Sequence, residues 1–158
     1  MKFETKIRKN YDRKEPGYDY MKYYRVIRYW VKAKYGVSTP DLEMMFFLYS
    51  ERIFNKTKFN EFEEIMSWDR NRFDRLLRDG WIGVWRKRHK SQTTLYELSY
   101  KGKRLIDVVY KKLNGEEISE EKNPLFLQSA SYSDTVYRNM IIKLNQEIRF
   151  HNNQNHNQ

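Results

Sequence analysis

The side chains best suited to chemistry in this sequence are arginines, and one group of them, together with an asparagine, closely follows Ser67. The group comprises Arg70, Asn71, Arg72, Arg75 and Arg78. A guanidinium can donate two hydrogen bonds to the edge of guanine, and an Asn amide can pair in the same way with adenine. If the apolar side chains of this segment face the core, Arg72 and Arg75 share the exposed side of a helix. The pattern therefore predicts a helix surface that could read base edges.

A second cationic group stands between two stretches rich in β-branched and aromatic residues, which favour a hairpin. It comprises Arg86, Lys87, Arg88, His89 and Lys90, with no acidic residue among them. Such a hairpin tip could contact phosphates or the minor groove. Each group also has a less specific interpretation. The first could be an ordinary helix face on which Arg pairs with neighbouring Asp, and the second a solvated hairpin tip.

Three tryptophans accompany the two cationic groups, namely Trp68, Trp81 and Trp85. Indole rings can stack on the bases of a single strand, as aromatic residues do in proteins that bind single-stranded nucleic acid. Trp81 is better suited to packing beneath the hairpin. For Trp85 the pattern favours neither role.

Other kinds of chemistry find little support in the sequence. It contains no Cys, so it has no disulfide, no thiolate nucleophile and no Cys-based zinc site. The three His residues lack the spacing of a metal site, and the run from Glu61 to Glu64 has no partner for acid–base work. We find no phosphate-cradling loop and no cofactor motif. We therefore expect no enzymatic activity, no metal and no cofactor.

The formal net charge is +10 in 158 residues, and it is unevenly placed. Residues 1–38 carry +7 (11 Lys or Arg against 4 Asp or Glu), and residues 67–104 carry +7 from the same numbers. Between them, residues 39–66 carry −3, and residues 105–158 carry −1. Basic surfaces attract nucleic-acid phosphates through counterion release. No apolar run has the roughly 20 residues of a membrane span, so we expect a cytoplasmic protein.

The elements that would position these groups follow from periodicity and capping residues. Residues 1–17 are expected to form a flexible basic arm. Apolar spacing predicts a helix from Tyr20 that ends at Gly36, and a second helix that opens with Thr39 as its cap. Residues 56–59 are expected at the edge of a small sheet. A short helix with Asn60 and Glu63 as its capping pair follows, and Ser67 is expected to cap the Arg-bearing helix up to Asp79.

The second half of the chain is expected to continue with the hairpin, whose strands lie between Trp81 and Leu98. Ser99 then caps a helix over residues 100–113. Residues 114–130 are expected to form a linker, and Ser133 to open a last helix. The tail from His151 contains only Asn, Gln and His, and we expect it to be disordered.

Residues 39–113 resemble the MarR family of winged-helix regulators in the order and spacing of their motifs. The motifs on which the resemblance rests are Thr39-Pro40 at a helix start, Leu76-Leu77-Arg78-Asp79-Gly80-Trp81-Ile82 before the hairpin, and Leu98-Ser99-Tyr100-Lys101-Gly102-Lys103-Arg104-Leu105 after it. Wings of the family carry an Asp-x-Arg pattern near the tip, which this hairpin lacks. The resemblance implies a mostly α fold with a small β-hairpin wing, a winged helix-turn-helix (residues 18–113, with the leading helix) flanked by N- and C-terminal helices.

The resemblance also implies a homodimer formed by the first and last helices, the last over residues 131–150. The expected interface residues are Tyr20, Tyr24, Ile27, Val31, Met140, Ile141, Leu144 and Ile148. We expect a double-stranded DNA-binding protein, a homodimeric transcriptional regulator, with Arg70, Asn71, Arg72 and Arg75 and the hairpin cations at the DNA. The alternative is a winged-helix structural or adaptor protein, for example of a phage particle or a replication complex. It would bind nucleic acid without sequence choice, or bind protein.

Overall fold

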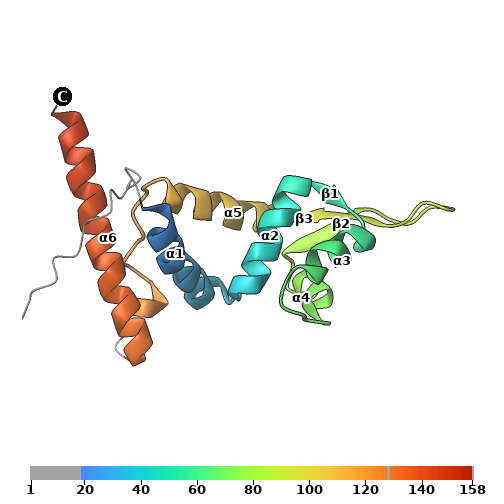
Figure 1. The fold of residues 1–158 in the computed structure, drawn as a ribbon, viewed down its shortest axis with the longest axis horizontal. Coiled ribbons are helices and arrows are strands. Elements are labelled where there is room, and N and C mark those ends of the chain that lie inside the picture. The colour runs from blue at the N-terminus through green and yellow to red at the C-terminus, as the bar shows by residue number, and fades with distance from the viewer. Residues whose placement is uncertain (1–18, 128, 158) are drawn as a thin grey trace, which may run out of the picture.

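The computed structural model describes residues 19–127 and 129–157, and the expected basic arm of residues 1–17 lies outside them. The chain is mostly helical with one small antiparallel sheet, as the sequence predicts (Figure 1). Its elements are α1 (Tyr20–Tyr35), α2 (Thr39–Glu51), β1 (Ile53–Phe54), α3 (Lys56–Glu64), α4 (Arg72–Arg78), β2 (Ile82–Arg86), β3 (Leu95–Leu98), α5 (Tyr100–Leu113), η1 (Pro124–Phe126) and α6 (Tyr132–His156).

The sheet and the short helices form a winged helix-turn-helix at one end of the molecule (Figure 1). The strand order is β1-β3-β2, and both pairs are antiparallel. β2 and β3 form the wing, while β1 adds a third strand by pairing Phe54 with Tyr96. At the other end, α1 and α6 pack against each other, and α5 runs between the two ends. In the described part of the chain, no helix combines the length and the apolar character that crossing a bilayer requires.

Helix starts are set by polar side chains that satisfy the first free amides. The first helix ends at Gly36, which adopts a left-handed φ of 70°, as expected. The second begins one residue earlier than predicted, because Ser38 and not Thr39 accepts the capping bond, from the amide of Asp41. Ser99 caps α5 as expected, by accepting from the amide of Gly102. Ser131 and not Ser133 caps α6, in a capping box with Asp134.

The segment between α2 and α4 differs from the expectation. Residues 56–59 are not a sheet edge, because Asn55 accepts a hydrogen bond from the amide of Lys58 and starts α3 there. Asn60 and Glu63 therefore lie inside α3 and do not cap it. The strand is β1, which precedes that cap. Helix α4 starts at Arg72, five residues beyond Ser67, so Ser67 is not its cap.

The first and last helices pack against each other within one chain, so most of the residues expected at a dimer interface lie in the core of the monomer. Ile27, Val31 and Ile141 are 0% exposed, and Leu144 and Ile148 are buried with them. The hydroxyl of Tyr29 donates to Asp134 at 2.9 Å and its ring stacks on that of Tyr137.

Of the remaining expected interface residues, Tyr24 is half-buried and donates to Glu43. Burial, with Glu43 beside it, raises the pKa of Tyr24 to about 12. Met140 is half-buried, and only Tyr20 is largely exposed. The apolar stripes of α1 and α6 thus serve the fold of the monomer.

The segment from residue 114 to 127 is anchored to the core by buried side chains, and it is not a free linker. Ile118 and Leu125 are each 1% exposed, so both belong to the core. The side chain of Asn145 in α6 bonds both the amide and the carbonyl of Ile118, at 3.0 and 2.8 Å, in the manner of a strand partner. The expected disordered tail is also helical, because α6 continues to His156.

Gly102 in the first turn of α5 has a packing role. A Cβ built at this position would lie 2.4 Å from the carbonyl oxygen of Trp81. That oxygen is held in place, because it accepts hydrogen bonds from both the amide and the hydroxyl of Ser99. The wing and α5 are therefore joined by a backbone contact that any side chain at residue 102 would displace.

Gly102→Ala is expected to destabilise the fold by about 1–3 kcal/mol, since the overlap is with fixed backbone. The higher helix propensity of Ala recovers less than about 1 kcal/mol of this. Urea unfolding followed by circular dichroism measures the difference. Gly83→Ala in β2 is the matched control, because its Cβ would meet nothing within 4 Å. Equal midpoints for the two variants would contradict the packing role.

Candidate nucleic-acid interface

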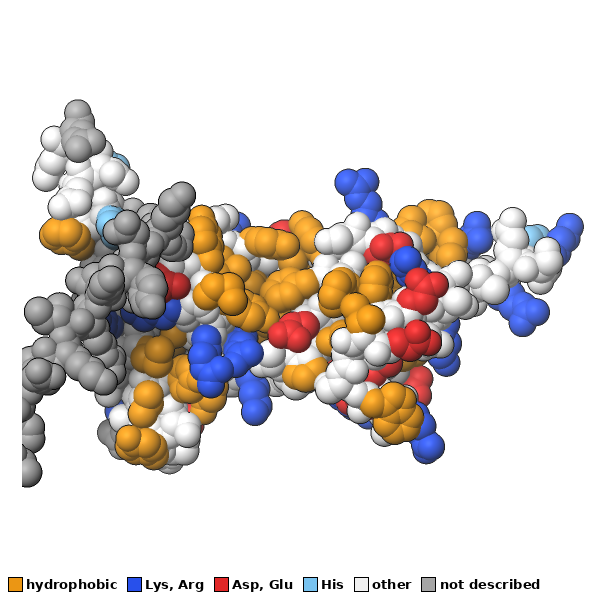
Figure 2. Space-filling model, viewed as in Figure 1, with side chains coloured by type: hydrophobic (Ala, Val, Ile, Leu, Met, Phe, Trp, Pro, Cys, Tyr) orange, Lys and Arg blue, Asp and Glu red, His pale blue; other side chains and the backbone are white. Residues whose placement is uncertain are grey.

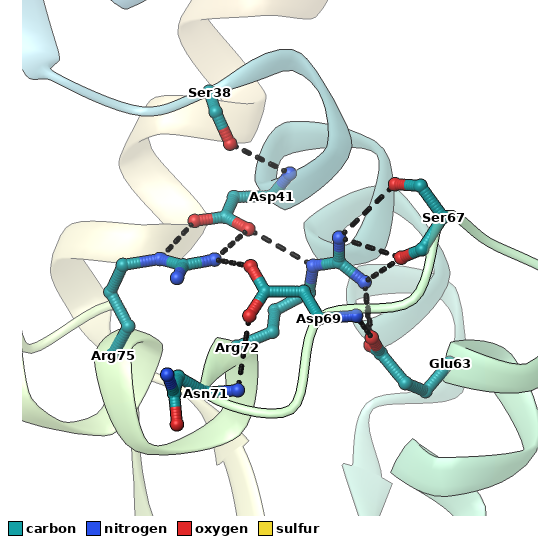
Figure 3. Close-up of polar contacts among 8 residues, drawn as sticks. All are labelled: Ser38, Asp41, Glu63, Ser67, Asp69, Asn71, Arg72 and Arg75. Atoms are coloured by element: carbon teal, nitrogen blue, oxygen red, sulfur yellow. Dashed lines mark hydrogen bonds and ion pairs between the residues drawn. The ribbon is translucent and has the colours of Figure 1, made fainter.

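The structure places Arg72 in the interior, not on the exposed face that the sequence predicts. The residue is only 2% exposed. Its Nε donates to Oδ1 of Asp41 at 3.0 Å, and its Nη1 lies 2.6 Å from each carboxylate oxygen of Glu63 (Figure 3). Nη1 and Nη2 both donate to the carbonyl oxygen of Ser67, at 3.2 Å. Arg72 is therefore committed to the protein and is not available to a base.

Arg75 extends the same cluster toward the surface. Its Nε and Nη2 bind the two oxygens of Asp41, both at 2.8 Å, and Nη2 also binds Asp69 at 2.7 Å. Hydrogen bonds to Asp41 and Asp69 raise the pKa of the Arg75 guanidinium. The bonds that Asp69 accepts from Arg75 and from the amide of Asn71 lower the pKa of its carboxyl. The side chain of Arg75 keeps 31% exposure.

We call these five residues (Asp41, Glu63, Asp69, Arg72 and Arg75) the arginine cluster. It joins the first turn of α2, the end of α3, the α3–α4 turn and the start of α4 (Figure 3). Three carboxylates face two guanidinium groups, so the cluster carries a formal charge of −1. It thus accounts for part of the acidic block found in residues 39–66 and cancels part of the basic block that follows.

Several of the residues predicted for base reading remain on the surface. Arg70 and Asn71 are exposed, and Asn71 stands at the N-cap of α4 without a side-chain capping bond. Arg78 is exposed and pairs with its neighbour Asp79, at 3.2 Å. Leu77, expected in the core, is 36% exposed, whereas Phe73 and Leu76 are buried as predicted.

The wing keeps its cations free of carboxylates. Arg86, Lys87, Arg88 and Lys90 are all exposed, and none forms an ion pair within the described residues. Figure 2 shows Lys and Arg side chains at the far end of the hairpin, beyond the body of the molecule. In place of an Asp-x-Arg brace, Thr94 accepts from the amide of Arg88, and His89 and Gln92 exchange backbone hydrogen bonds.

The three tryptophans near these cations differ in environment. Trp81 is 5% exposed and packs beneath the wing, as the sequence favours. Trp85 is 49% exposed on β2, with the Arg86 guanidinium 5.9 Å from its ring. Trp68 precedes α4 and is 79% exposed.

Comparison with models of protein families, with curated proteins and with solved structures finds no match for this chain. Its resemblance to the MarR family therefore rests on the motifs quoted above and stays a prediction.

The sequence contained the signals for the arginine cluster, although they lie far apart. Asp41 stands in the first turn of α2, where an acid is expected for helix-dipole reasons alone. Glu63 lies in a run of acids that has the appearance of a solvated face. Each carboxylate has an ordinary local explanation, and only the tertiary contact with Arg72, 31 residues after Asp41, reveals the shared role.

Arg72→Ala is expected to lower the free energy of unfolding by about 3–5 kcal/mol, because it removes the buried guanidinium that bridges Asp41 and Glu63. An exposed Arg72, as the sequence predicts it, would contribute little to stability. Arg78→Ala is the matched control. Its side chain is 73% exposed, so its loss should change stability by less than about 1 kcal/mol. Urea midpoints of the two variants, measured at neutral pH, compare them directly. An Arg72→Ala variant as stable as Arg78→Ala would contradict the structural role.

Proposed function

We propose that this chain binds double-stranded DNA, in the cytoplasm, through the wing and the start of α4. The observation that carries the proposal is the wing itself. Arg86, Lys87, Arg88 and Lys90 project from a winged helix-turn-helix frame, and no carboxylate of residues 19–127 or 129–157 pairs with any of them. An exposed cationic hairpin is suited to phosphate contacts, which give most of the affinity for DNA and make it depend on salt.

The arginine cluster limits what α4 can add to that binding. With Arg72 and Arg75 held internally, the exposed cations of the turn and helix are Arg70 and Arg78. The exposed acids Asp74 and Asp79 match them in number. Recognition of base edges would depend on Asn71 and Arg78, and Arg70 is placed to meet a phosphate. We therefore propose that the wing supplies most of the affinity for DNA and that a few side chains at α4 recognise bases.

A second candidate is favoured by the same burial of Arg72. A structural or adaptor protein needs phosphate contacts but no base reading, and the wing supplies the former without Arg72. The first candidate, a MarR-like homodimeric regulator, would need a dimer surface other than the one expected, because Ile27, Val31 and Ile141 are buried within the monomer. The regulator and a structural or adaptor protein that binds nucleic acid share DNA binding and differ in sequence choice, whereas an adaptor that binds protein would need no DNA contact.

Replacing Arg86, Lys87, Arg88 and Lys90 by Ala is expected to flatten the dependence of DNA affinity on salt. Each lost phosphate contact lowers the slope of log K against log salt by about one. Fluorescence anisotropy with a labelled mixed-sequence duplex, repeated over a series of salt concentrations, gives the slope. An unchanged slope would contradict the proposed role of the wing.

The matched control removes four exposed cations elsewhere, with Arg25, Lys32, Lys111 and Lys143 changed to Ala. These side chains lie on α1, α5 and α6, so net charge falls equally while the wing is intact. The control should keep the slope of the unmodified protein. Selection from a random duplex pool then separates the candidates. A recovered motif supports a regulator, and salt-sensitive binding without a motif supports the structural or adaptor protein.

A further inference from the structure

Trp68 is the most exposed of the four tryptophans in the chain, with 79% of its surface open. Trp30 and Trp81 are buried at 2% and 5%, and Trp85 is intermediate at 49%. Indole is a large, mostly apolar ring, and leaving it in water forgoes the stabilisation that burial gives. The placement of Trp68 has no folding benefit that the described contacts show.

The backbone on both sides of Trp68 is fixed by the arginine cluster. The carbonyl of Ser67 accepts two hydrogen bonds from Arg72. The amide of Asp69 donates to Glu63 at 3.0 Å, and the carboxylate of Asp69 bonds to Arg75 and to the amide of Asn71. A large exposed ring therefore stands on an ordered turn. Because only two side-chain torsions remain free, little entropy would be lost when a partner covers it.

The surroundings of Trp68 indicate the chemistry of that partner. The ring borders a groove of about 550 Å³ between the start of α2 and residues 67–72. Arg70 and the side-chain carboxamide of Asn71 beside it are exposed and have no hydrogen-bond partner within the described residues. The nearest acid, Asp69, is turned toward Arg75 and the Asn71 amide. The open groups are therefore a cation, an amide and an apolar ring.

We propose that Trp68 contacts duplex DNA directly, with its ring against deoxyribose and base-edge methyl groups while Arg70 meets a neighbouring phosphate. This inference rests on the proposed function and adds an apolar anchor to it. Apolar contact with the thymine methyl is an established mode of recognition in the major groove. Trp is also the residue type most often found at the energetic centre of an interface.

Trp68→Ala is expected to weaken binding to a mixed-sequence duplex roughly tenfold or more, as loss of an anchor residue does. The slope of affinity against salt should stay the same, because no phosphate contact is lost. Arg70→Ala, in contrast, should lower that slope by about one. Tyr132→Ala is the matched control, since this aromatic side chain is 85% exposed at the start of α6. It should bind as the unmodified protein does.

Tryptophan fluorescence gives a second readout. In a Trp85→Phe background, Trp68 is the one indole that is more than 5% exposed, so acrylamide quenching reports on it. Addition of the duplex should reduce that quenching.

The possible results separate the two proposals. If Trp68→Ala binds the duplex as Tyr132→Ala does and quenching is unchanged by DNA, the anchor is overturned while wing-dependent binding stands. The exposed ring would then fit a protein partner instead. If the unmodified protein does not bind the duplex at all, both the proposed function and the anchor fail. Tenfold weaker binding with an unchanged salt slope and a protected Trp68 supports the anchor.

Discussion

Burial of the Arg72 guanidinium is the constraint on which the arrangement of this winged helix depends. A permanently charged group can be 2% exposed only if carboxylates and carbonyls surround it. Asp41, Glu63 and the carbonyl of Ser67 meet that need from three different segments. The relative positions of α2, α3 and the α3–α4 turn are therefore coupled, and apolar packing of Phe73 and Leu76 completes the junction.

The cluster also decides where positive charge is available. It neutralises two of the arginines that lie closest to the expected reading surface, whereas the wing cations form no ion pair in the part of the chain that the structure describes. The result is a molecule in which exposed cations project from the hairpin, while exposed acids match the exposed cations of α4 and the turn before it in number. Salt-dependent phosphate contact and limited base reading are the natural consequences of that distribution.

Local patterns in the sequence predicted much of the fold, for identifiable reasons. Gly36 and Ser99 were sufficient to place helix boundaries, because capping chemistry acts over three or four residues. The hairpin followed from its β-branched and aromatic strands. The start of α3 was missed because Asn60 and Glu63 also form a capping pattern, whereas the helix begins after Asn55, which directly follows β1.

The candidate site was less predictable, since it depends on contacts between distant residues. Helical spacing correctly placed Arg72 and Arg75 on one side of α4, but the prediction that this side faces solvent was wrong. It faces Asp41 and the interior. The apolar stripes of α1 and α6 correctly indicated burial, yet a stripe does not reveal whether its partner lies in the same chain. Likewise, Ile118 is covered because Asn145 binds its backbone from α6, a pairing that neither segment signals alone.

Amide hydrogen exchange in the α3–α4 turn tests the central role of the arginine cluster most directly. The amides of Asp69 and Asn71 bond to Glu63 and Asp69, and neither touches Asp41. If the cluster acts as a unit, Asp41→Asn should nevertheless lower the protection of both amides more than that of Gly115, which follows α5. Unchanged protection at Asp69 and Asn71 in this variant would contradict the account.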